Sequence, residues 1–183
     1  MSEAAKYLTK EELKRLFKVI KTPRDRAIFH VAYFRGLRAS EVGKLQLASL
    51  KLGAKRLFVR RGKGSLAAEF LLSDIEVKLL RAWIKERGLD PGPIFLSNRG
   101  KGISRQQIYV LTSKYCDQAG IAKEKAHPHV LKHSLGTHLL QGGMPLLKVK
   151  HLLGHKKLSS TEHYLHLADN ELDEAAAQFY DSW

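Results

Sequence analysis

Cysteine is almost absent from this 183-residue sequence. Cys116 is the only one, so no internal disulfide can form, and a cysteine-rich zinc site is excluded. Long apolar stretches are also missing: no run approaches the roughly 18 residues that a membrane-spanning helix needs. Neither a signal peptide nor a lipidation motif is recognisable. These absences favour a cytoplasmic protein that works in reducing surroundings.

Acidic residues are scarce relative to basic ones. The sequence has 18 Asp and Glu against 32 Lys and Arg, which gives a net charge of +14 and an isoelectric point near 9.9. The basic residues are spread through the predicted helices and turns rather than gathered in a tail, so the positive charge should belong to the folded surface. A polyanionic partner is therefore expected, most simply nucleic acid.

The chain shows the organisation of one compact domain. No linker, internal repeat or low-complexity tract interrupts it, and 44% of its residues are hydrophobic. Periodicity and capping boxes predict helices over about 10–21, 24–34, 40–47, 73–88, 104–120, 128–142 and 145–154, then a short one around Tyr164 and an amphipathic one after Asn170. Alternation over 55–72, around a GKGS turn, predicts a small antiparallel hairpin. The predicted fold class is mainly α with a small antiparallel β-sheet (α+β).

Core candidates lie at helical spacing within these segments. In the helix predicted at 73–88, one face carries Ile75, Leu79, Leu80, Trp83 and Ile84. The same spacing marks Leu13, Leu16, Phe17 and Ile20 in the first helix, and Ile108, Leu111, Tyr115 and Ala119 in the helix at 104–120. These faces are expected to pack together in a single core.

Histidine is concentrated in one region, which raises the question of a metal. Eight of the nine histidines lie between positions 127 and 166. His129 with His133, and His151 with His155, have the four-residue spacing that places two imidazoles on one helical face. A zinc site needs further ligands, and a hydrolytic one needs the glutamate of an HExxH motif, which neither pair has. The metal interpretation is therefore weaker than one in which these residues handle a phosphate.

Groups suited to phosphate chemistry occur in five separated stretches. Such a site needs cations that converge on the nonbridging oxygens, an acid for the leaving oxygen and a nucleophile in line with it. The candidates are Arg38 in GLRASEV with Glu41 able to hold its guanidinium, Lys63 at the hairpin tip, His129 and Lys132 one helical turn apart, His155 after a glycine in LLGH, and Tyr164. Taken singly, each residue also fits an ordinary surface or packing role.

These stretches resemble the motifs of the tyrosine recombinases, also called phage-type integrases. The matching segments are GLRASEV, the hairpin lysine, HVLKH, LLGH and the T-x-x-Y-x-H pattern at 161–166, in the family's order and spacing. The resemblance implies an enzyme that cleaves double-stranded DNA by tyrosine attack, giving a 3′-phosphotyrosine and a free 5′-hydroxyl, and then rejoins strands. It also implies that neither ATP nor a metal is required. A topoisomerase would share this chemistry without strand exchange.

The resemblance also implies a role for each candidate residue. Tyr164 would be the nucleophile, and Arg38 would bind the nonbridging oxygens as charge develops on them. Lys63 would protonate the leaving 5′-oxygen. His129 would assist proton transfer at the tyrosine, and His155 would donate a hydrogen bond to the phosphate.

One position departs from the family pattern, because Lys132 stands where the family has a second arginine. A lysine keeps the positive charge but loses the planar fork that holds two phosphate oxygens. Losing one such hydrogen bond in the transition state costs on the order of 2–4 kcal/mol. The alternatives are an attenuated recombinase and a catalytically silent DNA-binding regulator of the same fold. For the attenuated enzyme, Lys132→Arg is expected to raise DNA cleavage.

The resemblance spans essentially all of residues 1–183. It implies a single catalytic domain without the N-terminal core-binding domain of most relatives. It further implies a tetramer on DNA, with the C-terminal helix at 170–183 exchanged between protomers, and mostly a monomer without DNA. The expected location is the cytoplasm, in association with the nucleoid.

Overall fold

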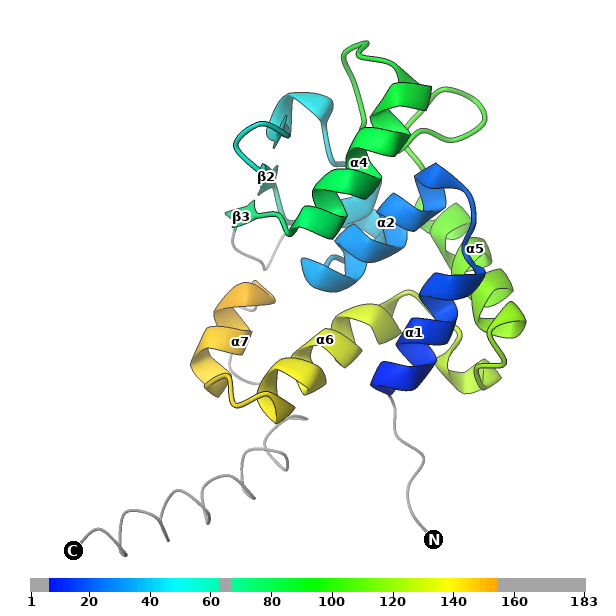
Figure 1. Cartoon of the computed structure of the whole chain (residues 1–183), viewed down its shortest axis with the longest axis vertical. Helices are drawn as coiled ribbons and strands as arrows, with labels where there is room; N and C mark the ends of the chain where they lie inside the picture. Colours follow the sequence, from blue (N-terminus) through cyan, green and yellow to red (C-terminus); the bar gives the residue numbers. More distant parts are fainter. Residues whose placement is uncertain (1–6, 63–66, 155–183) are drawn as a thin grey trace, which may run out of the picture.

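The computed structural model describes residues 7–62 and 67–154, which form helices packed around one core beside a small sheet (Figure 1). The predicted α+β class is confirmed. In chain order the elements are α1 (Lys10–Val19), α2 (Pro23–Phe34), α3 (Ala39–Val42), the 3-10 helix η1 (Leu47–Ser49), β1 (Leu50–Lys51), β2 (Arg56–Val59), β3 (Ala68–Leu71), α4 (Asp74–Arg87), α5 (Arg105–Gln118), the 3-10 helix η2 (Lys123–Lys125), α6 (His129–Gln141) and α7 (Leu146–Leu152).

Three helices begin at the capping boxes that the sequence predicts. The pairs are Thr9 with Glu12 at α1, Ser73 with Glu76 at α4, and Ser104 with Gln107 at α5. In each pair the first side chain accepts from the backbone N–H of the second residue, and the second side chain accepts from the backbone N–H of the first. Two otherwise unpaired donors are thereby satisfied at each helix start.

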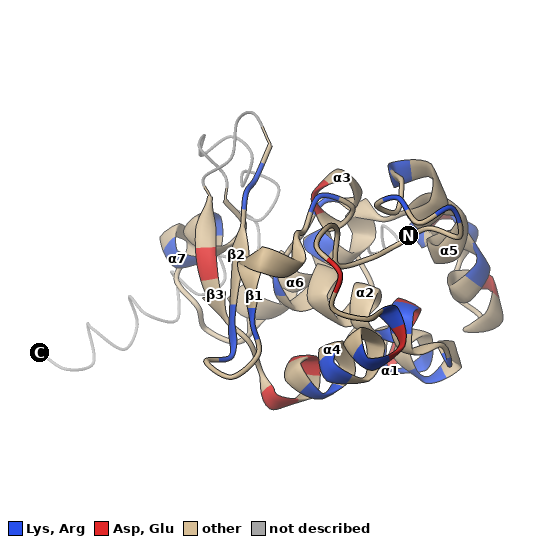
Figure 2. Ribbon diagram, turned by 90° about the horizontal axis from the view of Figure 1, so that it is seen from above, with Lys and Arg blue, Asp and Glu red and all other residues tan. Residues whose placement is uncertain are grey.

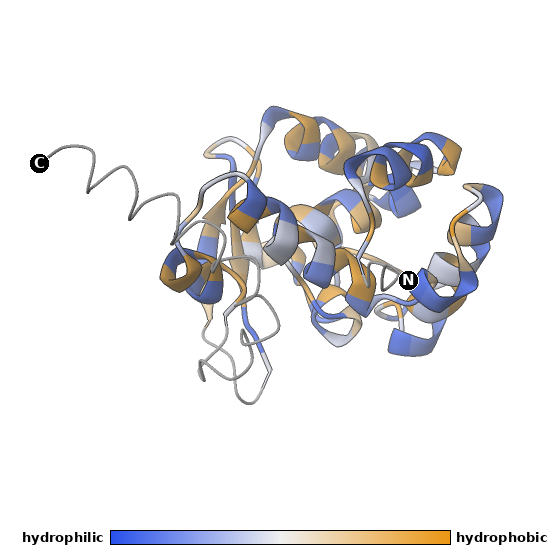
Figure 3. Ribbon diagram, turned by 90° about the horizontal axis from the view of Figure 1, so that it is seen from below, coloured by the Kyte–Doolittle hydropathy of each residue, from blue (hydrophilic) through white to orange (hydrophobic). Residues whose placement is uncertain are grey.

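Helix α2 lies at the centre of the described part of the chain and packs against α4 and α6 (Figure 1). It is buried on most of its faces, since Ala27, Ile28, Phe29, Val31, Ala32 and Tyr33 are all core residues. Helix α6 is likewise buried along most of its length, whereas α1, α4 and α5 each keep an exposed face. Hydrophobic and hydrophilic positions alternate along the helical ribbons (Figure 3). Because α2 is held from several sides, the turn that follows it has a fixed position.

The sheet has three antiparallel strands in the order β1-β2-β3, so the predicted hairpin gains a strand. Leu57 pairs with Leu50 on one side and with Phe70 on the other. Leu57 and Val59 are buried while Phe58 is exposed, which confirms the predicted alternation. Strand β1 was missed because two residues are too short to show a period of two.

The helix predicted at 40–47 is wrong in length, since α3 ends at Val42. Beyond it the backbone pairs with the 92–94 segment: Ile94 N–H donates to Leu45 O, and Leu47 N–H donates to Gly92 O. Gly43 permits a close approach, because a Cβ there would lie 2.0 Å from Ile103 O. The chain therefore meets a neighbouring loop at the point where a helix would have continued. Leu45 is nevertheless buried, as the hydrophobic pattern predicts.

The predicted burial of Ile75 is also wrong, because 46% of this residue is exposed. Its neighbour Glu76 is fully buried and accepts a 2.9 Å hydrogen bond from Arg35 at the end of α2. This ion pair turns Glu76 inward, and Ile75 consequently faces outward. The other positions of the predicted face, Leu79, Leu80 and Ile84, are buried and Trp83 is half-buried.

Several predicted features lie outside the described residues. They are the tip of the hairpin at 63–66, the helix expected around Tyr164 and the C-terminal helix at 170–183. Within 7–62 and 67–154, no helix is long and apolar enough to cross a membrane. The same residues contain no group of three His, Cys, Asp or Glu side chains that could hold a metal ion.

Candidate active site

The turn after α2 presents Arg38 at the surface. Gly36 reverses the chain with a φ of +56°, and a Cβ there would lie 2.6 Å from a methyl group of Leu153. Both the backbone conformation and the close packing therefore require glycine. Leu37 is buried and anchors the turn, so that Arg38 follows it directly at the start of α3. In the GLR sequence, the glycine therefore makes the turn, the buried leucine anchors it, and the arginine extends to the surface.

Glu41 holds Arg38 by two contacts. One carboxylate oxygen, Oε2, accepts from the backbone N–H of Arg38 at 2.8 Å, and Oε1 accepts from Arg38 Nη1 at 3.1 Å. Glu41 is 3% exposed, whereas a third of the Arg38 side chain is exposed. A buried carboxylate thus orients a guanidinium that reaches the surface, as the sequence indicates, and charge-assisted bonds of this kind fix geometry well.

Arg38 and His129 line the same cleft, which has a volume of about 390 Å³. His129 begins α6, whose first turn faces the Arg38 segment. The other lining residues are Ala39, Ser40, Arg105, Tyr109, His127 and Pro128. Positive and aromatic side chains from three distant stretches therefore meet in one cleft.

Arg105, Tyr109 and His127 were not predicted as site residues. Arg105 and Tyr109 lie one turn apart on the exposed face of α5, and Tyr109 is 49% exposed. An exposed aromatic beside a cation is the signal that could have identified them. His127 lines the cleft beside them.

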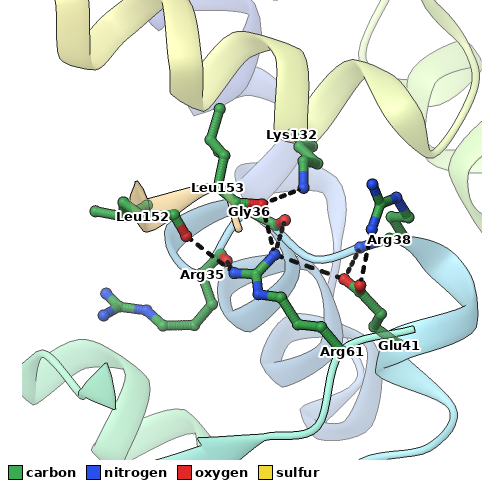
Figure 4. Close-up of polar contacts among 8 residues, drawn as sticks. All are labelled: Arg35, Gly36, Arg38, Glu41, Arg61, Lys132, Leu152 and Leu153. Atoms are coloured by element: carbon green, nitrogen blue, oxygen red, sulfur yellow. Dashed lines mark hydrogen bonds and ion pairs between the residues drawn. The ribbon is translucent and has the colours of Figure 1, made fainter. Parts of the chain in front are cut away.

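Lys132 lies one turn after His129 but points to the interior. It is 6% exposed, and its ammonium donates to the carbonyl oxygen of Leu153 at 2.6 Å (Figure 4). Burial, followed by the positive charges of Arg61 and Arg38, lowers the pKa of Lys132 to about 7, and the negative charge of Glu41 partly opposes this shift. The charge at this position is therefore sensitive to pH near neutrality.

His129 has a lowered pKa for related reasons. Partial burial at the cleft is the main cause, and the charges of His127, Arg38, Lys132 and Arg105 add to it. At neutral pH the imidazole is therefore mainly uncharged. A neutral imidazole can accept a proton, which is the task of a general base.

Arg61 is a buried arginine that the sequence-based search for site residues missed (Figure 4). Its Nη1 donates to Leu153 O at 2.8 Å and to Gly36 O at 3.4 Å. Its Nη2 donates to Arg35 O at 2.9 Å and to Leu152 O at 3.0 Å. A signal was present, because the alternation of Leu57 and Val59 places the next inward position at 61.

Three further candidates, Lys63, His155 and Tyr164, lie outside the described residues. The residues that precede two of them are described. Gly62 precedes Lys63, and Gly154, which ends the turn after α7, precedes His155.

Lys and Arg residues elsewhere are spread over α1, α4, α5, α7 and the sheet (Figure 2). This agrees with the expectation that the positive charge belongs to the folded surface.

Comparison with known protein families gives a match over most of the chain. The phage integrase family matches residues 6–171. The chain is 36% identical to the tyrosine recombinase XerC of Oceanobacillus iheyensis, covering 92% of this chain and 59% of that protein. It is 31% identical to the type 1 fimbriae regulatory protein FimB of Escherichia coli, covering 97% of this chain and 88% of that protein. The chain thus spans about three fifths of XerC and most of FimB.

Solved structures with this fold include two recombinases above a quarter identity. A crystal structure of the XerA recombinase superimposes with a TM-score of 0.79 at 30% identity, covering 94% of this chain and 64% of that one. The XerH site-specific recombinase bound to its difH substrate, in a pre-cleavage complex, gives a TM-score of 0.76 at 26% identity, covering 94% and 52%.

Proposed function

Because this chain belongs to the phage integrase family, we propose that it is a site-specific DNA recombinase or integrase that cleaves and rejoins strands through a 3′-phosphotyrosine. The observation that carries this proposal is the shared cleft, where Arg38, oriented by the buried Glu41, lies with His129. A guanidinium and a neutral imidazole in one cleft supply an oxyanion-stabilising cation and a proton acceptor.

The cleavage step assigns one role to each residue. The hydroxyl oxygen of Tyr164 attacks phosphorus while the bond to the 5′-oxygen breaks, and the tyrosine proton passes to His129. Lys63 gives a proton to the departing 5′-oxygen, and Arg38 and His155 stabilise the charge on the nonbridging oxygens. The roles of Tyr164, Lys63 and His155 rest on the family resemblance, because these residues lie outside the described part of the chain.

Rejoining reverses this step with a 5′-hydroxyl from the same or a partner strand. The phosphodiester energy is kept in the phosphotyrosine bond, so the reaction as proposed consumes no ATP. It needs no metal either, because protein cations neutralise the phosphate.

Double-stranded DNA is the proposed partner. The net charge of +14 suits a polyanion. The XerH site-specific recombinase was solved bound to its difH substrate, and the Tn1549 transposon integrase was solved in complex with transposon right end DNA. Binding should weaken steeply with salt, since neutralised phosphates release counterions. We further propose a tetramer on DNA, with the helix at 170–183 exchanged between protomers, mostly a monomer without DNA, and a location on the nucleoid in the cytoplasm.

The silent DNA-binding regulator is the second candidate, because Lys132 replaces an arginine of the family pattern. The relatives named above as recombinases support the enzyme instead. Mere DNA binding would also not require Arg38, Lys63 and Tyr164 in the family's order. Covalent trapping of DNA separates the two candidates directly.

The test is a suicide substrate, a duplex carrying the target site with a nick that lets the cleaved fragment diffuse away. The parent protein should form a covalent protein–DNA adduct on a denaturing gel, and Tyr164→Phe should form none. The target can be found beforehand by sequencing the genomic DNA that the protein retains. Absence of an adduct from the parent, on a duplex that it binds specifically, would support the silent regulator.

A further inference from the structure

We propose that Arg61 is a positioning residue of this site: its buried guanidinium connects the Arg38 turn to the end of α7, and it occupies the space that a longer side chain at position 132 would need. The shorter side chain of Lys132 then fits beside the Arg61 guanidinium. This inference rests on the recombinase function proposed above. It concerns the described residues Arg35 to Glu41, Arg61, Lys132 and Leu152 to Gly154 (Figure 4).

The Arg61 guanidinium is enclosed in the protein interior. Its side chain has no exposed surface, and its two terminal nitrogens donate to four backbone carbonyls. The Glu41 carboxylate adds an ion pair at 3.8 Å. Burying a guanidinium costs several kcal/mol unless its donors are satisfied. Here the carbonyls and the carboxylate satisfy the two terminal nitrogens, while Nε has no hydrogen-bond partner among the described residues. Arg61 is therefore placed to hold backbone segments and cannot itself reach a phosphate.

The packing around Arg61 is shaped to its side chain. The Phe70 ring lies against the guanidinium, with 5.4 Å between Cζ and the ring centroid. Gly154 packs against the stem, because a Cβ there would lie 2.6 Å from Arg61 Cδ. The glycine of the LLGH stretch thus gives room to Arg61 as well as adopting a positive φ of 69°.

The segments that Arg61 joins each carry a proposed reacting residue. Arg35 and Gly36 precede Arg38 in the same turn. Leu152 and Leu153 end α7 just before His155 in the sequence, and Arg61 itself stands two positions before Lys63. One guanidinium therefore fixes the spacing of three chain segments that must act on one phosphate, where misplacement by about 1 Å can cost a hundredfold in rate.

Lys132 completes this arrangement from α6. Its ammonium and Arg61 Nη1 donate to the same oxygen, Leu153 O, at 2.6 and 2.8 Å. The two cationic heads are therefore immediate neighbours. An arginine at 132 would bring a second, wider guanidinium into space that Arg61 fills. The sequence pattern predicts faster DNA cleavage for Lys132→Arg. We now expect that increase only when the Arg61 guanidinium is absent.

A double-mutant cycle on the suicide substrate tests this dependence. The rate of adduct formation is measured for the parent, Lys132→Arg, Arg61→Met and the double variant. Arg61→Met alone should slow the reaction at least tenfold, and Lys132→Arg alone should give no increase. The double variant should be at least tenfold faster than the product of the two single effects predicts. Additive effects, a parental rate for Arg61→Met, or a faster Lys132→Arg would each overturn the proposal.

A matched control separates position from charge. Arg56 lies on β2, the strand that leads to Arg61, but its side chain is exposed. Arg56→Met therefore removes one positive charge from the surface, as Arg61→Met removes one from the interior. Its rate should stay within about twofold of the parent, in keeping with a small electrostatic effect at an exposed site. If Arg56→Met slowed the reaction as much as Arg61→Met, the effect would be one of overall charge, and the proposal would fail.

A second readout does not depend on DNA cleavage. The groups that face the Lys132 ammonium are Arg61 next to the sheet, Arg38 and Glu41 at α3, His129 on its own helix and the Leu153 carbonyl after α7. In the DNA-free protein, the Lys132 side-chain signal, identified by its loss in Lys132→Met, is titrated by NMR. Removing the positive charge of Arg61 should raise the pKa of Lys132, whereas Arg56→Met should leave it in place.

These two readouts keep the proposals distinguishable. If the parent forms no adduct, the recombinase function fails, and the titration still decides whether Arg61 and Lys132 are coupled. If Arg61→Met does not fold by circular dichroism, Arg61→Gln removes the charge while keeping one amide donor, and the same outcomes apply. An unchanged Lys132 pKa in the folded neutral variant would overturn the pairing.

Discussion

The guanidiniums of Arg38 and Arg61 both contact the Glu41 carboxylate, but they differ in exposure and in their other hydrogen-bond acceptors. Arg38 contacts Glu41 at 3.1 Å with a third of its side chain exposed at the cleft. Arg61 contacts it at 3.8 Å with no exposed surface and four carbonyl acceptors. The same functional group therefore faces an open cleft in one place and is enclosed by the fold in the other. Exposure and the available acceptors, rather than residue type, decide which.

The comparison extends to the residues around each arginine. On the cleft side, His129 and Arg105 leave the space beside Arg38 open to a ligand. On the interior side, Lys132, Phe70 and Gly154 fill the space around Arg61. Changes on the cleft side should therefore alter rate with little effect on stability, and changes on the interior side should alter both.

The largest expected effect on the cleft side is that of Arg38→Ala. Adduct formation should fall by about 10² to 10³, as when one preorganised oxyanion donor is removed, while the melting temperature should change by no more than a few degrees. Rates on the suicide substrate and thermal melting by circular dichroism measure both. Arg81→Ala, at an exposed position of α4, controls for lost charge. A loss below tenfold would place the phosphate elsewhere.

Glu41→Gln should have the next largest effect, because this residue contacts both arginines. Losing charge-assisted hydrogen bonds worth about 1.5–3 kcal/mol should slow adduct formation roughly 10- to 100-fold and also lower the free energy of unfolding. The exposed Glu69 of β3 provides the control Glu69→Gln. If Glu41→Gln changed the rate but left urea unfolding at its parental midpoint, its contact with Arg61 would be energetically unimportant.

A change of pH should affect the interior side, where Lys132 lies, through stability rather than through rate. The pKa of Lys132 lies near 7 in the folded chain and near 10.5 in the unfolded one, so between these values the unfolded chain binds the extra proton. Stability should therefore rise with pH over this window, by at most about 1.4 kcal/mol per pH unit. Urea unfolding of the parent and Lys132→Met between pH 7 and 10 measures the difference. Equal slopes for the two proteins would show that Lys132 titrates normally.

Much of the fold follows from short-range sequence signals. The starts of α1, α4 and α5 were predictable because a capping box satisfies local donors within four residues. Strand β1 and the early end of α3 were not, because both depend on backbone pairing with distant segments. Long-range contacts of this kind leave little trace in a single sequence.

The site divides in the same way. Arg38, Glu41 and His129 were predictable because each belongs to a motif, and the contact of Arg38 with Glu41 spans only three residues. The role of Arg61 was not, since its acceptors lie 25 to 92 positions away. The inward position of 61 was readable from the strand alternation, but the alternation alone does not indicate which acceptors a buried arginine would find there.

The most direct measurement is mass spectrometry of the trapped protein–DNA adduct after digestion with a nuclease and trypsin. One modified peptide, containing Tyr164, should carry a nucleotide joined through its 3′-phosphate. The modification should be absent from Tyr164→Phe and strongly reduced in Arg38→Ala. A nucleotide on a different residue, a 5′-phosphate link, or no modified peptide from a duplex that the protein binds specifically would contradict the proposed cleavage step.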